Sequence, residues 1–146
     1  MRALMQRVNE ARVLVDGEEW AKIGRGLLVY LGIHEKDTDK EAEWIVKKLL
    51  QARVFDDAGG RMTHSVVDIH GEILVVSQIT LYGDFSKGNR PDMSSSMRPR
   101  EAEELYKKFI SKLKEASGLE VKKGQFGARM DIQSVNHGPV TLLIEA

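Results

Sequence analysis

The segment Gly26–Ile33 is one of the longest apolar runs of the chain, and both of its alternating faces are apolar. Successive side chains of a β-strand point to opposite faces of the sheet, so a strand of this kind needs cover on both sides. We therefore expect it to be a central strand. The run is far shorter than the roughly 18 residues of a membrane-spanning helix, and we expect no membrane partner.

Further strand patterns lie on either side of this segment. Arg12–Val15 and Trp20–Ile23 flank Asp16-Gly17, a dipeptide that supplies the positive φ angles of a tight hairpin. Glu72–Leu81 has an apolar centre and is expected to be a second central strand. The C-terminal part of the chain is expected to return to strands, of which Val140–Ile144 is the last.

Two segments have the spacing of amphipathic helices. Thr38 and Glu41 match a capping box, in which two side chains satisfy free backbone N–H groups of the first turn. Pro99 is well placed as the first residue of a second helix, and Gly118 is well placed to end it. The expected buried stripes are Ala42, Ile45, Val46, Leu49 and Ala52 in the first helix and Ala102, Leu105, Phe109 and Leu113 in the second.

Two irregular segments separate these elements. Phe55–Gly60 has the composition of a turn, and Tyr82–Pro99 has no periodicity. Structureless loops longer than about 12–15 residues are uncommon in compact domains unless they are functional. The whole pattern predicts an α/β fold in which residues 1–146 form a single domain, with a mixed, largely antiparallel, barrel-like sheet and two helices packed on it.

The composition limits the chemistry that the chain can carry. It has 22 basic and 22 acidic residues, so contact with nucleic acid requires a local patch rather than a global positive field. It has no cysteine, which excludes disulfides, cysteine-ligated zinc and thiol nucleophiles. The early charges Arg2 and Arg7 do not fit a signal peptide, and we expect a soluble, cytoplasmic protein.

The histidines and the acidic pairs indicate no site of their own. Asp56-Asp57 and Glu103-Glu104 fit a solvated turn and a helix start. The histidines lie far apart and lack the spacing of metal ligands, and no glycine-rich segment has a phosphate-binding pattern, so we expect neither a metal nor a cofactor. The four histidines are His34, His64, His70 and His137.

Two polar segments are candidates for a site. Ser77-Gln78-Ile79-Thr80-Leu81 follows an apolar strand and precedes the long loop, a common place for polar side chains to face a substrate. It can equally be a strand that becomes amphipathic at the surface. In Asn136-His137-Gly138-Pro139-Val140-Thr141, Gly-Pro favours a tight turn, although glycine also lets a ligand or another backbone approach closely. Neither segment alone identifies an activity.

Together, the motifs SQxTL and NxGPVT resemble those of the D-aminoacyl-tRNA deacylase family, also called D-tyrosyl-tRNA(Tyr) deacylases. The resemblance covers essentially the whole chain in the same order. Ile79 is a departure, because the family often has Phe there, and it should slightly reshape an apolar pocket wall. The other segments that carry the resemblance are Gln6-Arg7-Val8, Ala11-Arg12-Val13, Gly26–Val29, Arg53-Val54-Phe55, Gly88-Asn89-Arg90-Pro91, Ala102–Tyr106 and Gly124–Met130.

The resemblance implies an enzyme that hydrolyses the ester joining a D-amino acid to the 3′ end of tRNA and that also removes mischarged glycine. It implies a homodimer with the active site at the interface. Ser77, Gln78 and Thr80 are then the expected catalytic residues, with nearby backbone N–H groups as oxyanion donors. An aminoacyl ester is already activated, so positioning and oxyanion stabilisation suffice without a thiol, a metal or a histidine base.

The resemblance also implies that Gly138-Pro139 is in the cis form and reaches into the partner's pocket to select chirality. If the two carbonyls hold the substrate α-amino group, a D side chain points to open space and an L side chain collides with the wall. Glycine has no side chain to collide, and many D-amino acids are tolerated. Arg7 is expected to brace the Gly138-Pro139 turn by bonding to a carbonyl.

Ile79, Phe126 and Met130 are expected at the wall or rim of this pocket, although core packing explains Phe126 and Met130 as well. The sequence does not decide which group attacks the ester. Thr80 is one candidate nucleophile, but no side chain beside it in the sequence could serve as its base. We favour an attacking water, aided by a ribose hydroxyl of the substrate.

Local positive charge is expected to contact the tRNA. The loop Asp84–Arg100 has four basic and two acidic residues, a net charge of +2. Binding through such residues should weaken as salt rises, whereas ordinary surface charge is the alternative explanation. The expected phosphate contacts are Lys87, Arg90, Arg98, Lys122 and Lys123.

Two other functions are consistent with parts of the sequence. One is a tRNA-binding module that hydrolyses nothing, but such a module need not keep both motifs intact. The other is a general serine or threonine esterase, which would want a GxSxG elbow or a partnered histidine, and neither is present.

Overall fold

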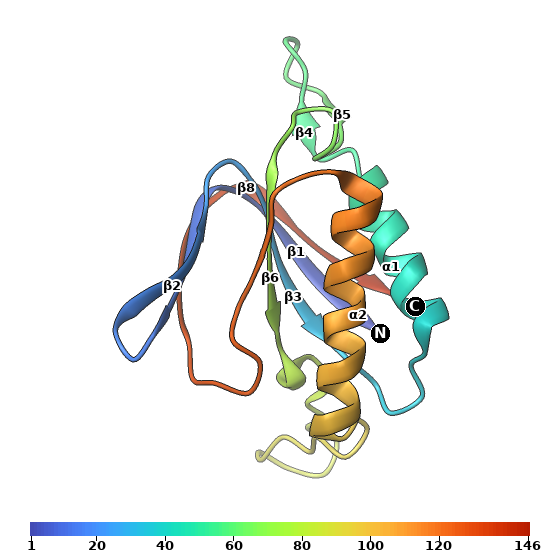
Figure 1. Cartoon of the computed structure of the whole chain (residues 1–146). Coiled ribbons are helices and arrows are strands. Elements are labelled where there is room, and N and C mark those ends of the chain that lie inside the picture. Colours follow the sequence, from blue (N-terminus) through green and yellow to red (C-terminus); the bar gives the residue numbers. More distant parts are fainter.

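A six-stranded mixed sheet runs through the centre of the computed structural model, which describes residues 1–146 (Figure 1). Its strand order is β2-β1-β3-β6-β7, and β8 pairs with β1. Strand β1 is antiparallel to β2, β3 and β8, whereas β6 is parallel to both β3 and β7. The strands of this sheet are β1 (Arg2–Val15), β2 (Glu18–Ile23), β3 (Gly26–Gly32), β6 (Glu72–Ser77), β7 (Val121–Lys123) and β8 (Asp131–Glu145).

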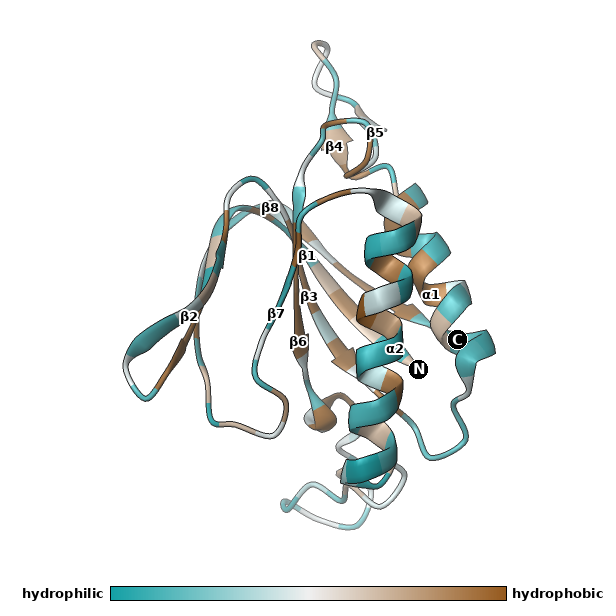
Figure 2. Ribbon diagram, in the orientation of Figure 1, coloured by the Kyte–Doolittle hydropathy of each residue, from teal (hydrophilic) through white to brown (hydrophobic).

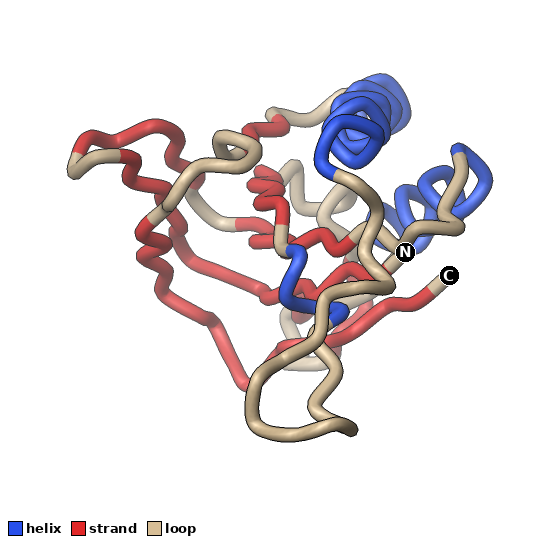
Figure 3. Tube along the Cα trace, turned by 90° about the horizontal axis from the view of Figure 1, so that it is seen from below, coloured by secondary structure: helices blue, strands red, loops and turns tan.

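The great length of β1 gives the sheet its nearly barrel-like shape. The first half of β1 pairs with β3 and the second half with β2, while β8 follows β1 along nearly its whole length. The indole N–H of Trp20 on β2 donates to the Lys123 carbonyl of β7 over 3.2 Å, which joins the two ends of the sheet. Figure 3 shows the strands curving around one side of the molecule. The predicted fold class is therefore confirmed.

Helices α1 (Asp39–Gln51) and α2 (Pro99–Ser117) cover one face of the sheet and turn their hydrophobic sides toward it (Figure 2). The predicted capping box of Thr38 and Glu41 is present. Helix α2 begins at Pro99 and ends at Gly118, which has a left-handed φ of 65°. Neither helix is long and apolar enough to cross a membrane.

Strand β3 is buried from both sides, as predicted. Leu27, Val29 and Leu31 belong to a core of 24 buried residues that includes the predicted apolar stripes of both helices except Ala52. Ala52 is only partly buried, because α1 ends at Gln51. Leu28 belongs to a second core of 7 buried residues inside the curved sheet. The rim of this central layer, where β3 and β6 end, positions the candidate site.

Three sequence predictions were wrong in detail. The predicted strand Glu72–Leu81 stops at Ser77, because the chain turns there into a short 3₁₀ helix, η1 (Ile79–Tyr82). Val140–Ile144 is not a separate strand, and Gly138-Pro139 is no turn between two strands. Both lie within β8, because β1 supplies a pairing partner on either side of the Gly-Pro pair. The turn predicted at Phe55–Gly60 is part of a small separate hairpin, formed by β4 (Phe55–Asp56) and β5 (Met62–His64).

Candidate active site at the end of β6

The polar segment that follows β6 forms a tight turn at the rim of the sheet. The Gln78 N–H still donates to the Leu31 carbonyl of β3 over 2.8 Å, which is the last bond of the parallel pair. The chain then reverses, and the Gly83 N–H donates to the Thr80 carbonyl over 3.0 Å. The Gln78 side-chain amide donates to the Thr80 hydroxyl. The turn therefore presents an amide and a hydroxyl together at the surface.

A pocket of about 420 Å³ opens beside this turn. It lies between the end of β6, the start of α2 and the segment that leads into β8. Its wall is largely apolar, with 10 hydrophobic residues among 14, and no histidine or carboxylate lines it. The lining residues are Leu31, Ile33, Val76, Ser77, Gln78, Ile79, Met97, Pro99, Ala102, Phe126, Gly127, Ala128, Met130 and Ile132.

The far wall of the pocket is held by packing against the core. The Tyr106 hydroxyl donates to the Val75 carbonyl over 2.8 Å, and its ring lies 5.6 Å from the Phe126 ring. Burial raises the pKa of Tyr106, so it stays neutral and acts as a structural donor. A Cβ at Gly124 would lie 2.8 Å from the Met130 sulfur, so only glycine lets Met130 pack this closely. Both predicted wall residues, Phe126 and Met130, line the pocket.

An arginine from the other end of the sequence holds the polar turn. Arg2 Nη1 donates to the Leu81 carbonyl over 2.8 Å, and the guanidinium lies 4.6 Å from the centre of the Tyr82 ring. Burial first, and then the negative charge of Asp37, raises the pKa of Tyr82 to about 12. Tyr82 is thus protonated at neutral pH and supplies no base. The sequence carried no signal for this role of Arg2, because it pairs with a residue 79 positions away.

The Gly138–Pro139 peptide bond is cis and lies in a wide bulge of β8, opposite Gln6–Val8 of β1. Arg7, which is almost completely buried, donates from Nε to the His137 carbonyl over 2.8 Å and from Nη1 to the Val54 carbonyl over 2.7 Å. The predicted bond from Arg7 to a carbonyl of this segment is thus present.

The two motifs do not meet within one chain. Ser77 pairs with Leu31 of β3, and Leu31 in turn lies opposite Ala3 of β1. The Gly-Pro bulge lies four to five residues further along β1, so the two motifs are roughly 15 Å apart in the direction of that strand. Gly138 and Pro139 are exposed and do not line the pocket.

The comparisons with known proteins agree over the whole chain. The family model of D-Tyr-tRNA(Tyr) deacylase matches residues 4–145. D-aminoacyl-tRNA deacylases of Thermosipho melanesiensis and Aquifex aeolicus are 48% and 49% identical over 146 residues, covering 100% of this chain and 97% and 98% of theirs. A solved structure of a c-Myc DNA Unwinding Element Binding Protein is 44% identical, covers 100% of this chain and 99% of its own, and superposes with a TM-score of 0.94.

The chain belongs to the D-Tyr-tRNA(Tyr) deacylase family. The predictions of this family and of an enzyme are therefore confirmed. Within a deacylase of this family, the pocket gathers Ser77, Gln78, Ile79, Phe126 and Met130 from two distant parts of the chain. Thr80 lies on the same turn without lining the pocket.

The basic residues predicted to contact tRNA lie on two parts of this deacylase fold, the loop between η1 and α2 and strand β7. Lys87 and Arg90 are exposed on the loop after η1, and Arg98 is exposed beside pocket residues Met97 and Pro99. The other two, Lys122 and Lys123, lie on β7. The start of α2 was missed as a pocket wall; its signal was the position of Pro99 at the end of the long loop.

Proposed function

We propose that this chain hydrolyses the ester of D-aminoacyl-tRNA to a D-amino acid and tRNA, and that it also removes mischarged glycine. The observation that carries the proposal is the turn with Ser77, Gln78 and Thr80 at the mouth of an apolar pocket. Membership in the deacylase family supplies the reaction class. Because tRNA is charged and used in the cytoplasm, we place the protein there.

The turn offers donors for the oxyanion. The first N–H groups of any helix have no partner within it, and no side chain caps η1. The N–H groups of Ile79 and Thr80 are therefore suited to stabilise negative charge on the ester carbonyl oxygen. Ser77 and Gln78 orient the terminal adenosine and the ester.

Water is the attacking group in this scheme. Its oxygen bonds to the ester carbon, the bond from that carbon to the ribose oxygen breaks, and the ribose oxygen takes up a proton. No hydrogen bond joins the Thr80 hydroxyl to a histidine or a carboxylate, so it lacks a base that would make it a nucleophile. A ribose hydroxyl of the substrate assists the water.

A second copy of the chain completes the site. Within one chain the cis Gly138–Pro139 pair is remote from the pocket, but a two-fold pairing would bring it to the partner's pocket. The same strand exposes three large apolar side chains, Val135, Leu142 and Leu143, about half of whose surface is open. These features support a homodimer in which the carbonyls of Gly138 and Pro139 hold the α-amino group and exclude L side chains.

Phosphates of the acceptor end then lie near the basic residues around the pocket. The proposed contacts are Lys87, Arg90, Arg98, Lys122 and Lys123. Each phosphate contact releases bound counterions from the nucleic acid, so affinity should fall as salt rises.

A paired assay tests the proposal. D-tyrosyl-tRNA and L-tyrosyl-tRNA are incubated with one enzyme preparation, and the remaining ester is measured over time. Fast loss of the D ester with the L ester spared is expected. Equal loss of both would remove the chiral filter but leave an esterase. If neither ester is lost while tRNA still binds, the chain is a tRNA-binding module and the proposed function is wrong.

A further inference from the structure

We propose that Phe85 is a stacking platform for an unpaired base of the tRNA 3′ strand, one that precedes the terminal nucleotide. The inference rests on the proposed function, because it assumes that the terminal nucleotide lies in the pocket beside η1. Phe85 follows η1 by three residues and is 62% exposed, more than any other large apolar side chain of the molecule.

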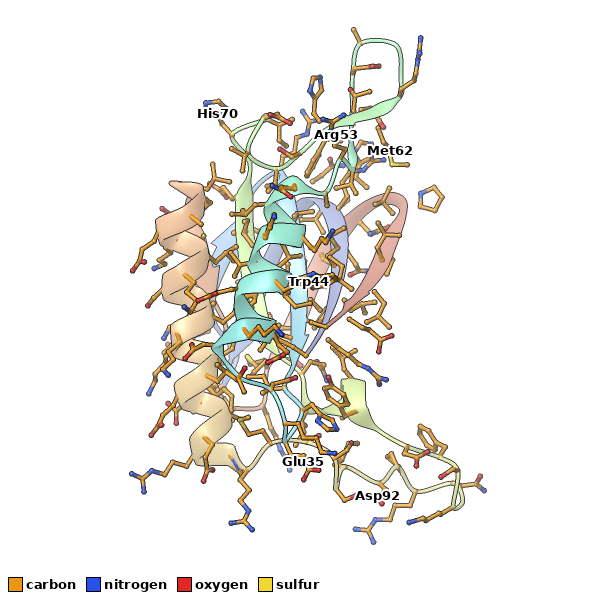
Figure 4. All side chains as sticks on the ribbon, turned by 90° about the vertical axis from the view of Figure 1, so that its right-hand side faces the viewer. Glu35, Trp44, Arg53, Met62, His70 and Asp92 are labelled. Atoms are coloured by element: carbon orange, nitrogen blue, oxygen red, sulfur yellow. The ribbon has the colours of Figure 1, made fainter.

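The loop that carries Phe85 has a fixed base. Asp84 and Asp92 exchange two backbone hydrogen bonds, of 2.9 and 2.8 Å. The Asp84 carboxylate accepts from the N–H and hydroxyl of Ser86, and the Asp92 carboxylate accepts from the N–H of Ser94. The two ends of Phe85–Pro91 are therefore held together by backbone hydrogen bonds, and the loop projects from this fixed base. Figures 3 and 4 show this loop extending away from the body of the molecule, with Asp92 labelled at its base.

The exposed ring has no partner within the chain. Two other exposed aromatic side chains have one: Trp20 donates to a β7 carbonyl, and Lys48 lies over the Trp44 ring. No aromatic, cation–π or hydrogen-bonding contact engages the Phe85 ring. An exposed aromatic ring on a projecting loop is therefore available to a ligand.

The two cations on the same loop as the ring favour a nucleic acid as that ligand. The loop carries two cations, Lys87 and Arg90, and neither forms an ion pair. The two carboxylates at its base, Asp84 and Asp92, accept hydrogen bonds from Ser86 and Ser94, and the positive charge of Lys87 helps to lower the pKa of both. An aromatic ring flanked by unpaired cations is the arrangement that binds single-stranded nucleic acid, where bases stack and phosphates meet positive charge.

The loop is also close enough to the pocket to be reached by the same strand. A Cβ at Gly83, the residue after η1, would lie 3.3 Å from Pro91 Cβ and 3.2 Å from Met93 Cε. The returning arm of the loop thus packs against the end of the polar turn. A strand whose terminal ester lies at this turn therefore has the loop within reach of its preceding nucleotides.

Two substrates separate this inference from the proposed function. One is D-tyrosyl-tRNA, and the other is D-tyrosyl-adenosine, which has the terminal nucleoside but no preceding base. For Phe85→Ala, the ratio of kcat/KM on the tRNA to kcat/KM on the nucleoside ester should fall about 5- to 150-fold, the equivalent of about 1–3 kcal/mol per stacked base. Phe85→Trp should restore the ratio. Met62→Ala, which removes another side chain exposed to 55%, is the matched control.

A direct reading of stacking comes from a tRNA carrying 2-aminopurine at each unpaired 3′ position in turn. Binding to the wild type should quench the fluorescence at one of these positions, and Phe85→Ala should abolish that quenching. An unchanged substrate ratio in Phe85→Ala, with the wild type active on D-tyrosyl-tRNA, overturns the inference and leaves the proposed function intact. A change in the sedimentation of Phe85→Ala would overturn it too, because the ring would then contact a second copy.

Discussion

At the scale of single residues, Arg7 links three parts of the molecule. Its buried guanidinium donates to carbonyls of His137 and Val54 and lies 3.1 Å from an Asp56 carboxylate oxygen. Removing it leaves buried carbonyls without donors, and hydrogen bonds from charged groups contribute about 1.5–3 kcal/mol each.

We therefore expect Arg7→Ala to lower the free energy of unfolding by about 3–5 kcal/mol, as measured by urea denaturation. Arg7→Ala should also hydrolyse L-tyrosyl-tRNA faster relative to D-tyrosyl-tRNA, because Arg7 holds the carbonyl of His137, the residue before Gly138. Arg12→Ala is the control, since Arg12 lies on the same strand with its side chain 46% exposed; its change should stay within about 0.5 kcal/mol. Equal destabilisation by both variants would contradict the role of Arg7.

Thr80 tests the choice of nucleophile. If its hydroxyl only orients Gln78 and the substrate, Thr80→Ala loses about one hydrogen bond, and kcat should fall about 5- to 10-fold. Single-turnover hydrolysis of D-tyrosyl-tRNA measures this, with Thr80→Ser as the conservative variant. Complete loss of activity in Thr80→Ala, together with an acyl-enzyme detected by mass spectrometry of the wild type, would make Thr80 the nucleophile.

At the scale of elements, the capping box of α1 makes a pH prediction. The Glu41 carboxylate accepts from the Thr38 hydroxyl and from the Thr38 N–H, and these bonds lower the pKa of Glu41 below its ordinary 4.5. Its contribution to stability is therefore present above that ordinary pKa and is lost as the pH falls through the lowered folded value. Thr38→Ala should destabilise the fold more at neutral pH than in acid.

Urea unfolding at about pH 7 and about pH 3 measures this difference. Glu41→Gln supplies the control, because glutamine keeps the shape of the side chain without titrating. In that background Thr38→Ala should cost the same at both pH values. A pH-dependent cost in the glutamine background would place the titrating partner elsewhere.

At the scale of the whole molecule, the separation of the pocket from Gly138–Pro139 predicts complementation between chains. Gln78→Ala removes the pocket amide, and a Cβ at Gly138 would lie 2.3 Å from Asn136 Oδ1, so Gly138→Ala should distort the Gly-Pro segment. Each variant alone should be inactive as a homodimer. Each mixed dimer keeps one complete site, so refolding the two together in equal amounts should restore about a quarter of the wild-type activity on D-tyrosyl-tRNA.

Activity that does not recover in the mixture would show that both motifs act within one chain. As a control, each variant is refolded with the wild type. The activity of such a mixture should fall only in proportion to the fraction of sites that contain a substituted residue. Sedimentation of each variant confirms that the chains still pair, so failure to assemble is distinguished from failure to complement.

Elements whose signals are local could be predicted from the sequence. The capping box at Thr38, the helix stop at Gly118 and the hairpin at Asp16-Gly17 depend on residues a few positions apart, and all three are present. The apolar residues on both faces of Gly26–Ile33 likewise predicted a strand that is covered on both sides, and β3 is such a strand. The pocket residues Ser77, Gln78, Phe126 and Met130 were reached through the resemblance of their motifs, and the structure brings them together.

Features that depend on distant partners could not be predicted from the sequence and follow from the three-dimensional fold. β6 ends at Ser77, where its pairing with β3 stops and the chain turns into η1, and β8 continues through Gly138–Pro139 because β1 pairs with it on both sides. Arg2 and Arg7 acquire their roles from carbonyls 79 and 130 residues away. Local patterns carry no information on such pairs, since backbone pairing across the sheet sets which residues meet.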